Sequence, residues 1–230
     1  ITTGEQQSAA LLVMTMESLG IPAVSLAGWQ AGIYTDCRYG DSDIRLIAPV
    51  RIREALSRGR VPVVTGFQGV CAAGDITSLG RGGSDTTAVA LAAALESDCC
   101  EIYTDVDGIY TADPRQIPDA VKLSAIDYRD MLALAGAGSQ VLHAKSVELA
   151  MANSVVIHLL SSFNDAPGSQ VRALRDGSRP DFAGITRSRT SGEISLAGKA
   201  ADAAALSRAV LLLACLLYTS PSPRDRQKSR

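Results

Sequence analysis

A cluster of polar and charged residues stands directly before a long apolar segment. Residues 81–85 read RGGSD, and the segment at 86–95 is almost entirely small and apolar. Two adjacent glycines let the backbone turn sharply and present N–H groups at the start of a helix, where the helix dipole also favours an anion. Ser84 is placed to cap that helix or to bind a ligand, and Arg81 carries a planar fork suited to carboxylate or phosphate.

Asp85 is the unexpected member of this cluster, because its carboxylate would repel the same anion. Its presence makes sense if a lysine, a metal–phosphate complex or a substrate ammonium group lies opposite. Two familiar phosphate-binding patterns do not fit: the P-loop needs a lysine after the glycines, and the dinucleotide fingerprint needs a glycine where Asp85 stands. The alternatives left open are a substrate site and a glycine-rich capped loop in which Arg81 is merely solvated.

A second polar stretch, EIYTDVDGIYTADPR, occupies residues 101–115. We expect a strand that ends at Thr104-Asp105, a two-residue hairpin turn at Asp107-Gly108, and a return through Tyr110 toward Asp113-Pro114-Arg115. Ligands of open α/β sheets bind at the carboxyl ends of strands. The stretch is therefore suited to hold a nucleotide base and its phosphates, and an ordinary surface hairpin is the alternative.

The elements that must position these residues follow from hydrophobic periodicity. Glu5 lies in the first turn of a predicted helix, where it either complements the helix dipole or binds an ammonium group. Strands and helices alternate, which predicts a three-layer α/β/α sandwich with a mainly parallel central sheet. Helices are predicted over residues 5–19, 49–58, 83–97, 128–135 and 141–152, and strands over residues 23–28, 61–67, 99–105 and 155–162, with 61–67 as an interior strand.

Composition limits the classes of partner. The 230 residues are 47% hydrophobic and 20% charged with a net charge of −2, so nothing draws the chain to nucleic acid or an anionic membrane. Five cysteines without a C-x-x-C pair and two isolated histidines predict no metal site and reduced thiols. The apolar run at 209–217 is too short to span a bilayer, and no signal peptide is evident. We therefore expect a cytoplasmic protein that binds small molecules.

The C-terminal part changes character. Residues 165–184 are rich in Pro, Gly, Ser, Asp and Arg, as a linker is. Two short strands and an Ala/Leu-rich helix are expected over residues 184–214, too little to enclose a core of their own. From residue 215 the sequence becomes basic and rich in Ser and Pro, and we interpret residues 215–230 as a non-native disordered tail.

Together these stretches resemble aspartate kinases of the amino-acid kinase family. The motifs that carry the resemblance run from Thr2 to Gly168: TTGEQQSAALLVMTMESLG, GFQGV, SLGRGGSDTTA, TDVDGIYTADPR and GSQVLHAKSVELA. Two of these motifs, SLGRGGSDTTA and TDVDGIYTADPR, are highly specific to aspartate kinases within that family. Residues 184–214 look like the opening of the ACT regulatory domains that follow such kinase domains.

The resemblance implies transfer of the ATP γ-phosphoryl group to the side-chain carboxylate of L-aspartate, which gives 4-phospho-L-aspartate, the first step toward lysine, threonine and methionine. Mg²⁺ would be held mainly by the ATP phosphates, with no protein metal ligands. Catalytic roles would fall to Asp85 and Arg81. The implied substrate-binding residues are Glu5, Phe67, Arg81, Gly82, Gly83 and Ser84, and the implied ATP-binding residues are Thr104, Asp105, Tyr110, Asp113, Arg115 and Gln140.

Two departures from the family pattern bear on activity. Family members carry a Lys-Phe/Tyr-Gly-Gly-Ser/Thr strand whose lysine clamps the phosphates, and we expect that strand to lie upstream of residue 1. Gln140 stands where members usually have a lysine facing ATP. We therefore predict a partial kinase domain at 1–172, a linker at 173–183, a truncated ACT-like domain at 184–214 and a fragment that is inactive alone.

The intact parent is expected to be a homo-oligomer joined through its ACT domains and to respond to an amino-acid feedback effector. Two alternatives remain open at this point. One is another amino-acid kinase that acts on a glutamate derivative or a nucleotide monophosphate. The other is a non-catalytic subunit that senses an amino acid.

Overall fold

The computed structural model describes residues 2–139, 141–175, 183–187 and 194–197. The helices are α1 (Thr2–Ser18), α2 (Val50–Ser57), α3 (Gly83–Leu95), α4 (Tyr128–Gly136) and α5 (Ala144–Asn153). The strands are β1 (Ala23–Leu26), β2 (Ile33–Thr35), β3 (Ile44–Ile47), β4 (Val61–Val64), β5 (Gln68–Val70), β6 (Ile76–Ser78), β7 (Cys99–Thr104), β8 (Ile109–Tyr110), β9 (Lys122–Leu123), β10 (Ala125–Ile126), β11 (Val156–Ser161), β12 (Ser169–Val171), β13 (Gly184–Arg187) and β14 (Ile194–Ala197).

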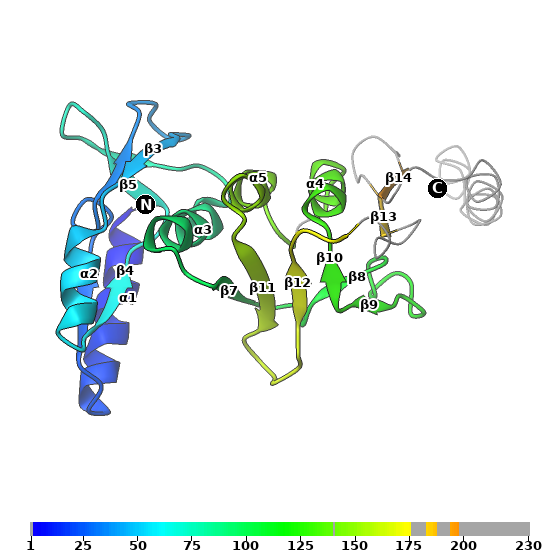
Figure 1. Cartoon of the computed structure of the whole chain (residues 1–230), viewed down its shortest axis with the longest axis horizontal. Helices are drawn as coiled ribbons and strands as arrows, with labels where there is room; N and C mark the ends of the chain where they lie inside the picture. Colours follow the sequence, from blue (N-terminus) through cyan, green and yellow to red (C-terminus); the bar gives the residue numbers. More distant parts are fainter. Residues whose placement is uncertain (1, 140, 176–182, 188–193, 198–230) are drawn as a thin grey trace, which may run out of the picture.

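A four-stranded sheet with the order β10-β12-β11-β7 forms the centre of one part of the molecule. Strands β7 and β11 run parallel over six residue pairs, whereas β12 returns antiparallel to β11. Helices α3, α5 and α4 lie side by side along one face of this sheet (Figure 1). The side chains of Met131, Val147, Ile157 and Leu159 are fully buried between the helices and the sheet. This packing gives the α/β architecture that the alternation of elements predicts.

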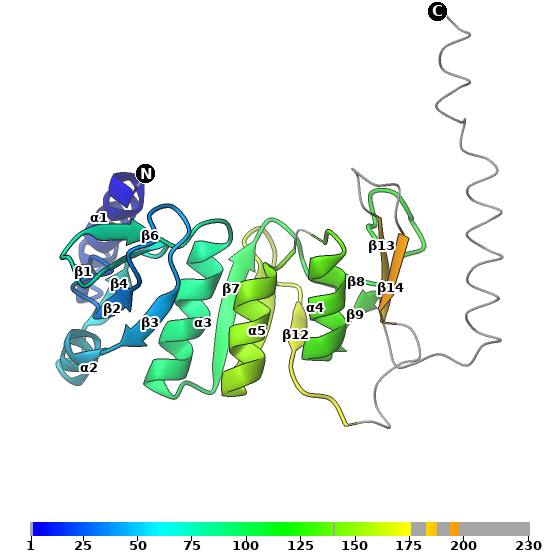
Figure 2. The same cartoon turned by 90° about the horizontal axis from the view of Figure 1, so that it is seen from above.

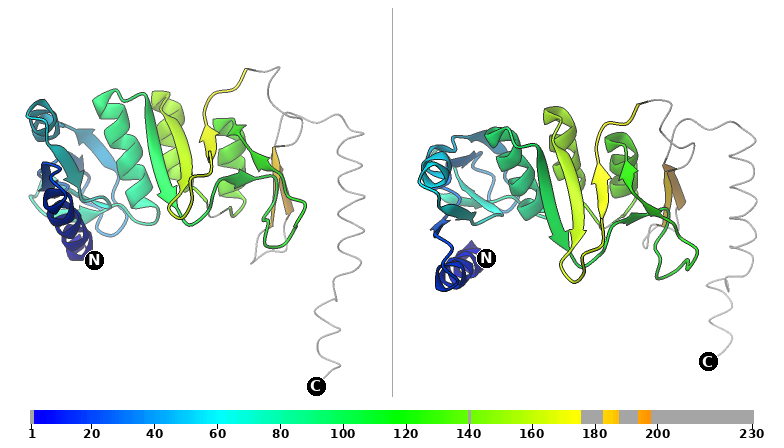
Figure 3. Two further views of the ribbon diagram at one scale, coloured as in Figure 1. Left: turned by 90° about the horizontal axis from the view of Figure 1, so that it is seen from below. Right: turned by 60° about the horizontal axis from the view of Figure 1, so that its bottom comes forward.

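The other part of the molecule contains the parallel pair β1·β4 with α1 and α2, and a small sheet with the order β3-β2-β5-β6. Helix α3 lies between this part and the central sheet (Figures 2 and 3). The sequence of α3 explains its central position, because small apolar side chains allow neighbouring elements to approach closely on several sides. Val89 of this helix is fully buried. The expectation of an apolar helix behind a polar N-terminus is confirmed.

The helix predictions agree with the structure to within a few residues. The predicted strand in 61–67 is present as β4 but is not interior among the described strands, and the predicted hairpin at Asp107-Gly108 is wrong. The segment 61–67 forms β4, but Val61 is 41% exposed, because among the described strands β4 pairs with β1 alone. Asp107-Gly108 does not form a two-residue hairpin, because β8 pairs with β9 and not with β7. Gly108 has φ +152°, which does not match the second central residue of a type I′ or II′ turn. The Asp107 carboxylate accepts a hydrogen bond from Lys122 Nζ at 3.1 Å.

The segment after the central sheet remains attached to it. Ala183 is 1% exposed within the main core, and Ile185 N–H donates to Thr111 O at 2.7 Å. Strands β13 and β14 pair antiparallel and pack on α4. The predicted strands are therefore present, whereas the division into domains stays a prediction. Most of the predicted linker, the predicted helix after residue 198 and the predicted tail at 215–230 lie outside the described residues.

Within the described ranges, no helix is both long and apolar enough to cross a membrane.

Candidate active site

The N-terminus of α3 is shaped by glycines. Gly82 is the N-cap residue and adopts the left-handed conformation with φ +70°, and no side chain of the described residues caps this end. The first turn is held by its own backbone, because Thr86 N–H donates to Gly82 O at 3.0 Å. A Cβ atom on Gly82 would lie 2.4 Å from Cβ of His143. Glycine is therefore required at this position both by the backbone angle and by the space that His143 occupies.

Phe67 adopts a left-handed conformation that is unusual for an aromatic residue, with φ +68°. Two hydrogen bonds hold it there: its N–H donates to Thr87 Oγ1 at 3.1 Å, and its carbonyl accepts from Leu79 N–H at 3.1 Å. The Thr87 hydroxyl in turn donates to Gly83 O at 2.7 Å. The buried Thr87 thus fixes Phe67 relative to the first turn of α3.

A groove with a volume of about 440 Å³ opens beside this turn. Glu5, Gly66 and Ser84 lie along it, and Thr87 is part of its wall. The remainder of the lining is apolar and comes from α2, β4 and α3, at Ile52, Pro62, Val64, Ala88, Leu91 and Leu95. The groove therefore brings the Glu5 carboxylate and the hydroxyl-bearing residues Ser84 and Thr87 together against an apolar floor.

Gln68 connects α1 to this site through two side-chain hydrogen bonds. Its side chain is completely buried, with Nε2 donating to Thr2 O at 3.2 Å and Oε1 accepting from Gln6 Nε2 at 3.2 Å. These bonds hold the first turn of α1 against β5 and so set the position of Glu5. An unpaired amide at such a depth would be costly, so both ends of the Gln68 side chain favour the same placement.

Arg81 lines a different hollow, of about 380 Å³, together with Gly80, Asp41, His143 and Lys145. Its side chain is exposed. Arg81 and Glu5, which the resemblance assigns to the two ends of one amino-acid substrate, thus line separate hollows on either side of the α3 N-terminus.

Asp85 carries its charge in a partly buried place. Burial raises the pKa of its carboxyl, and the electrostatic interaction with His143 acts in the opposite direction. Among the residues that the structure describes, none forms an ion pair with Asp85. His143 itself caps the N-terminus of α5, and its Nδ1 atom is buried with no hydrogen-bond partner in the described part of the chain. Among the described residues, the site therefore contains a partly buried carboxylate without an ion-pair partner, at Asp85, and a buried imidazole nitrogen without a hydrogen-bond partner, at His143.

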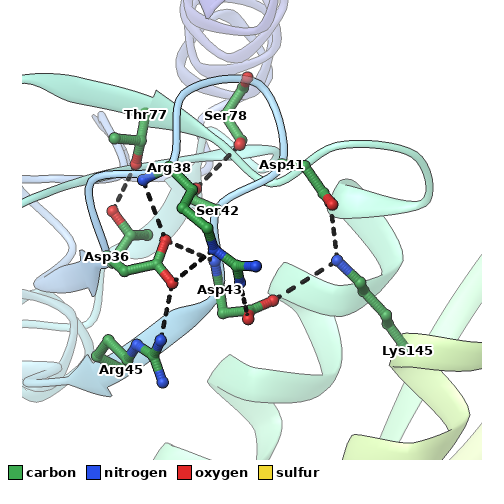
Figure 4. A network of polar contacts seen from close by, with 10 residues as sticks. Asp36, Arg38, Asp41, Ser42, Asp43, Arg45, Thr77, Ser78 and Lys145 are labelled. Atoms are coloured by element: carbon green, nitrogen blue, oxygen red, sulfur yellow. Dashed lines mark hydrogen bonds and ion pairs between the residues drawn. The ribbon is translucent and has the colours of Figure 1, made fainter.

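A loop at residues 36–43 borders the hollow at Arg81 and forms a network of ion pairs (Figure 4). Lys145, near the start of α5, contacts Asp41 Oδ1 at 2.8 Å and Asp43 Oδ1 at 3.5 Å. The hydrogen bond from Lys145 lowers the pKa of Asp41 and raises that of Lys145. Gly80 packs so closely on this loop that a Cβ atom there would lie 2.6 Å from Asp41 Oδ1. The loop is therefore anchored to both α5 and the turn before α3.

The predicted nucleotide-binding residues follow β7. The loop at 96–98 joins α3 to β7, so the two elements run in opposite directions and the carboxyl end of β7 lies at the same end of the layer as the α3 N-terminus. Thr104 Oγ1 donates to Asp105 Oδ1 at 3.2 Å there. Tyr110 Oη donates to Asp107 Oδ1 at 3.0 Å, which orients its ring.

Asp113 and Arg115 lie farther along this stretch, in an exposed turn. Asp113 Oδ1 accepts from Arg115 N–H at 3.0 Å, and Asp113 Oδ2 accepts from Gln116 Nε2 at 2.9 Å. The Asp113 carboxylate thus organises the turn. Gln140, the remaining predicted ATP-binding residue, lies outside the described residues.

Four residues of this site were missed by the sequence analysis: Gln68, Thr87, His143 and Lys145. Thr87 and Gln68 belong to the quoted motifs, but nothing in residue type alone distinguishes a buried hydroxyl or amide that positions a neighbour. His143 and Lys145 reach the site only because α5 packs against α3. Their sole sequence signal was their place in GSQVLHAKSVELA.

Comparison with known proteins shows the family to which this chain belongs. The family model described as "Amino acid kinase family" matches residues 1–161. The chain belongs to the amino acid kinase family. Among curated members, an aspartokinase of Thermus thermophilus is 49% identical over 197 residues, covering 86% of this chain and 49% of the relative. An aspartokinase of Corynebacterium glutamicum is 45% identical over 217 residues, covering 91% of this chain and 52% of the relative.

Solved structures of the family agree with the fold. Aspartokinase III of E. coli, in complex with aspartate and ADP, superposes with a TM-score of 0.74 at 30% identity, covering 80% of this chain and 42% of that one. Aspartate kinase from Synechocystis superposes with a TM-score of 0.65 at 43% identity, covering 78% of this chain and 29% of that one. The chain thus spans about half the length of the curated relatives that it matches.

Proposed function

We propose that this chain is part of an aspartate kinase, which transfers the γ-phosphoryl group of ATP to the side-chain carboxylate of L-aspartate and forms 4-phospho-L-aspartate. The observation that carries the proposal is the N-terminus of α3, where the sequence RGGSD presents backbone donors next to Arg81, Ser84 and a partly buried Asp85. The identity to aspartokinases over most of the chain supports the choice of aspartate as the acceptor.

The chemistry needs positioning more than proton transfer. A carboxylate acceptor is already ionised at neutral pH, so no general base is required. Phosphoryl transfer is then accelerated by in-line alignment and by stabilisation of charge on the transferring group. Backbone N–H groups at a helix N-terminus are fixed donors that need no rearrangement as the charge develops. Gly82 and Ser84 would supply such donors, whereas the Gly83 N–H donates to Gly80 O at 3.2 Å and Gly83 would contribute close backbone approach.

We assign the amino-acid end of the substrate to both sides of the α3 N-terminus. Arg81 binds the α-carboxylate through its planar guanidinium, and Glu5 binds the α-ammonium group. Phe67, whose ring packs against Gly83, would line the substrate pocket at this turn. Because Arg81 and Glu5 line different hollows, aspartate must lie across the α3 N-terminus or the exposed Arg81 side chain must turn toward the groove when substrate binds. Rotation of an exposed arginine side chain is a small and rapid change.

The ATP side is assigned to the carboxyl end of β7 and the segment that follows. Thr104, Asp105 and Tyr110 would contact the base and ribose, and Asp113, Arg115 and Gln140 would contact the ribose and phosphates. Mg²⁺ bound to the phosphates would neutralise their charge. Asp85 would face the cationic side of this arrangement, which accounts for a carboxylate whose pKa is raised by burial. ATP and free aspartate are both cytoplasmic metabolites, so we place the protein in the cytoplasm.

An amino-acid effector and a homo-oligomeric parent complete the proposal. One solved relative, E. coli aspartokinase III, is described in complex with lysine and aspartate in a T-state. The hairpin β13–β14 packs on α4 of the kinase core and would transmit the state of a following regulatory domain to that core.

The test uses the reading frame that contains residues 1–172, recovered with its flanking codons and expressed as a whole. Acyl phosphate is trapped as hydroxamate with ATP, Mg²⁺ and either L-aspartate or L-glutamate. We expect aspartate-dependent product, and Arg81→Ala should lower kcat/KM by tenfold or more. Arg51→Ala, at an exposed arginine of α2, is the matched control and should leave kcat/KM unchanged. Turnover of glutamate or a nucleotide monophosphate without turnover of aspartate would refute the proposal.

A further inference from the structure

Two cysteines from separate segments meet at one tight turn. Cys71 follows β5 and opens the turn, since Gly74 N–H donates to Cys71 O at 2.9 Å and Cys71 N–H donates to Asp75 O at 3.0 Å. Cys37 belongs to the loop at residues 36–43, which follows β2. Cys37 is exposed and Cys71 is buried, so one thiol of the two faces solvent.

The backbone on either side of Cys37 is attached to this turn. Before it, Tyr34 of β2 pairs with Val70 of β5 in a parallel register. After it, Tyr39 Oη donates to the Asp75 carboxylate at 2.6 Å. Cys37 is therefore held between two points of attachment to the strand and turn that contain Cys71, by contacts that do not involve either thiol.

The two thiols also influence each other electrostatically. Each thiol has the largest single effect on the pKa of the other, and the backbone of Ala73 lowers the pKa of both. This interaction raises the pKa of Cys37 and lowers the pKa of Cys71, so Cys71 gives up the first proton and the Cys37 S–H stabilises the resulting thiolate. A thiolate beside a thiol is the arrangement from which disulfides form.

We propose that Cys37 and Cys71 are a redox modification site that closes to an intramolecular disulfide on exposure to a peroxide. The thiolate attacks one oxygen of the peroxide, the O–O bond breaks, and a sulfenic acid and hydroxide form. The second thiol, as its thiolate, then attacks the sulfenic sulfur; the S–S bond forms and hydroxide leaves. The two thiol protons neutralise the two hydroxides, so two cysteines and one hydrogen peroxide give one disulfide and two waters.

The disulfide would act on the loop that borders the hollow at Arg81. That loop is held to α5 by Lys145 through Asp41 and Asp43, and these ion pairs are exposed and readily exchanged (Figure 4). A covalent link between Cys37 and Cys71 would anchor the same loop to the β5–β6 turn until the disulfide is reduced. Oxidation would therefore restrict the motion of the loop at residues 36–43, which borders this hollow.

The chain offers an internal control in its adjacent cysteines. Cys99 and Cys100 are consecutive in β7 and so point to opposite faces of the sheet, with Cys99 exposed and Cys100 buried. Burial raises the pKa of Cys100 to about 11, which keeps it protonated and unreactive. This pair should not close under conditions that oxidise Cys37 and Cys71.

The experiment treats the reduced 230-residue protein with a small excess of hydrogen peroxide, alkylates the remaining thiols and digests with trypsin. The cleavage sites in the sequence place Cys37 in the peptide 1–38 and Cys71 in the peptide 61–81. We expect these two peptides to be joined, with the loss of two hydrogen atoms, and dithiothreitol to separate them. Alkylatable thiols should fall from five to three per chain.

Two variants sharpen the result. Cys37→Ser, at an exposed position, should abolish the joined peptide and leave all four remaining thiols alkylatable, whereas Cys99→Ser should still yield it. The proposal is overturned if Cys37 and Cys71 both remain alkylated by the trapping reagent after peroxide. It is equally overturned if Cys37 proceeds to sulfinic acid without linkage, or if the linkage joins other cysteines or two copies of the chain. None of these outcomes depends on kinase activity.

Discussion

Substitution of Gly82 by alanine tests how the α3 N-terminus is built. At this position two separate costs act on a side chain: the left-handed backbone, with φ +70°, and the overlap of a Cβ atom with His143 at 2.4 Å. Gly59 provides a matched control because it has φ +69° and no atom within 4 Å of an added Cβ. The difference between the two alanine variants therefore isolates the contact with His143.

The expected magnitudes follow from those two costs. A left-handed alanine costs about 1–2 kcal/mol, and the lower entropy of its unfolded chain offsets about 0.4–1 kcal/mol of this. Gly59→Ala should therefore lower the free energy of unfolding by roughly 1 kcal/mol or less. Gly82→Ala adds the strain of overpacking, about 1–3 kcal/mol, because backbone at the start of α5 must shift. The gap between the variants should be about 1–3 kcal/mol.

Urea denaturation followed by far-ultraviolet circular dichroism measures this gap. With a slope of about 2 kcal/mol per molar urea, the midpoint of Gly82→Ala should lie about 1 M below that of Gly59→Ala. The double variant Gly82→Ala/His143→Gly removes the overlapping atoms, and glycine is tolerated at the N-cap position of α5. It should recover most of the gap in a double-mutant cycle. Equal midpoints for the two single variants would refute this account of Gly82.

Three further predictions concern the surroundings of this turn. Thr87→Val should lower the free energy of unfolding by about 1–3 kcal/mol, because the Phe67 N–H loses its acceptor. Thr87→Ser keeps the hydroxyl and should stay within about 0.5 kcal/mol of wild type in urea denaturation. Equal losses in the two variants would contradict this prediction. Burial raises the pKa of Asp85, so its ionised form destabilises the fold as pH rises above the ordinary carboxyl pKa. Asp85→Asn should therefore raise the urea midpoint at pH 7 but not at pH 3. A lower midpoint at pH 7 would argue against this prediction. Lys145→Met should return the depressed pKa of Asp41 toward its ordinary value in an NMR titration, and an unchanged pKa would show that another group lowers it.

Much of the site could be predicted from local sequence. The start of α3 at Gly83 follows from a glycine pair and an apolar run, and both signals lie within fifteen residues. Glu5 was placed correctly in the first turn of α1 for the same reason. The predicted cap by Ser84 is wrong, because Gly82 is the N-cap residue and Ser84 lies within the first turn. The roles of these residues toward substrate stay predictions until the kinetic test is done.

What could not be predicted depends on residues that are distant in the sequence. The Asp107-Gly108 pair has the composition of a hairpin turn, but the Asp107 carboxylate finds Lys122, and β9 offers β8 a better partner than β7 does. His143 approaches Gly82 only through the packing of α5 on α3. Local sequence propensity predicts neither the Asp107–Lys122 contact nor the His143–Gly82 contact, because both depend on tertiary packing.

The close contact between Gly82 and His143 also affects how such motifs persist during evolution. Glycines in a loop before a helix are commonly taken as a mark of phosphate chemistry, yet here one of them is demanded by a neighbouring side chain and by a backbone angle. A descendant that had lost catalysis but kept α5 against α3 would still be selected against any other residue at this position. A glycine pattern can therefore outlive the reaction that it is used to recognise, and Arg81, which is exposed and has no such packing constraint, would be the first of the cluster to drift.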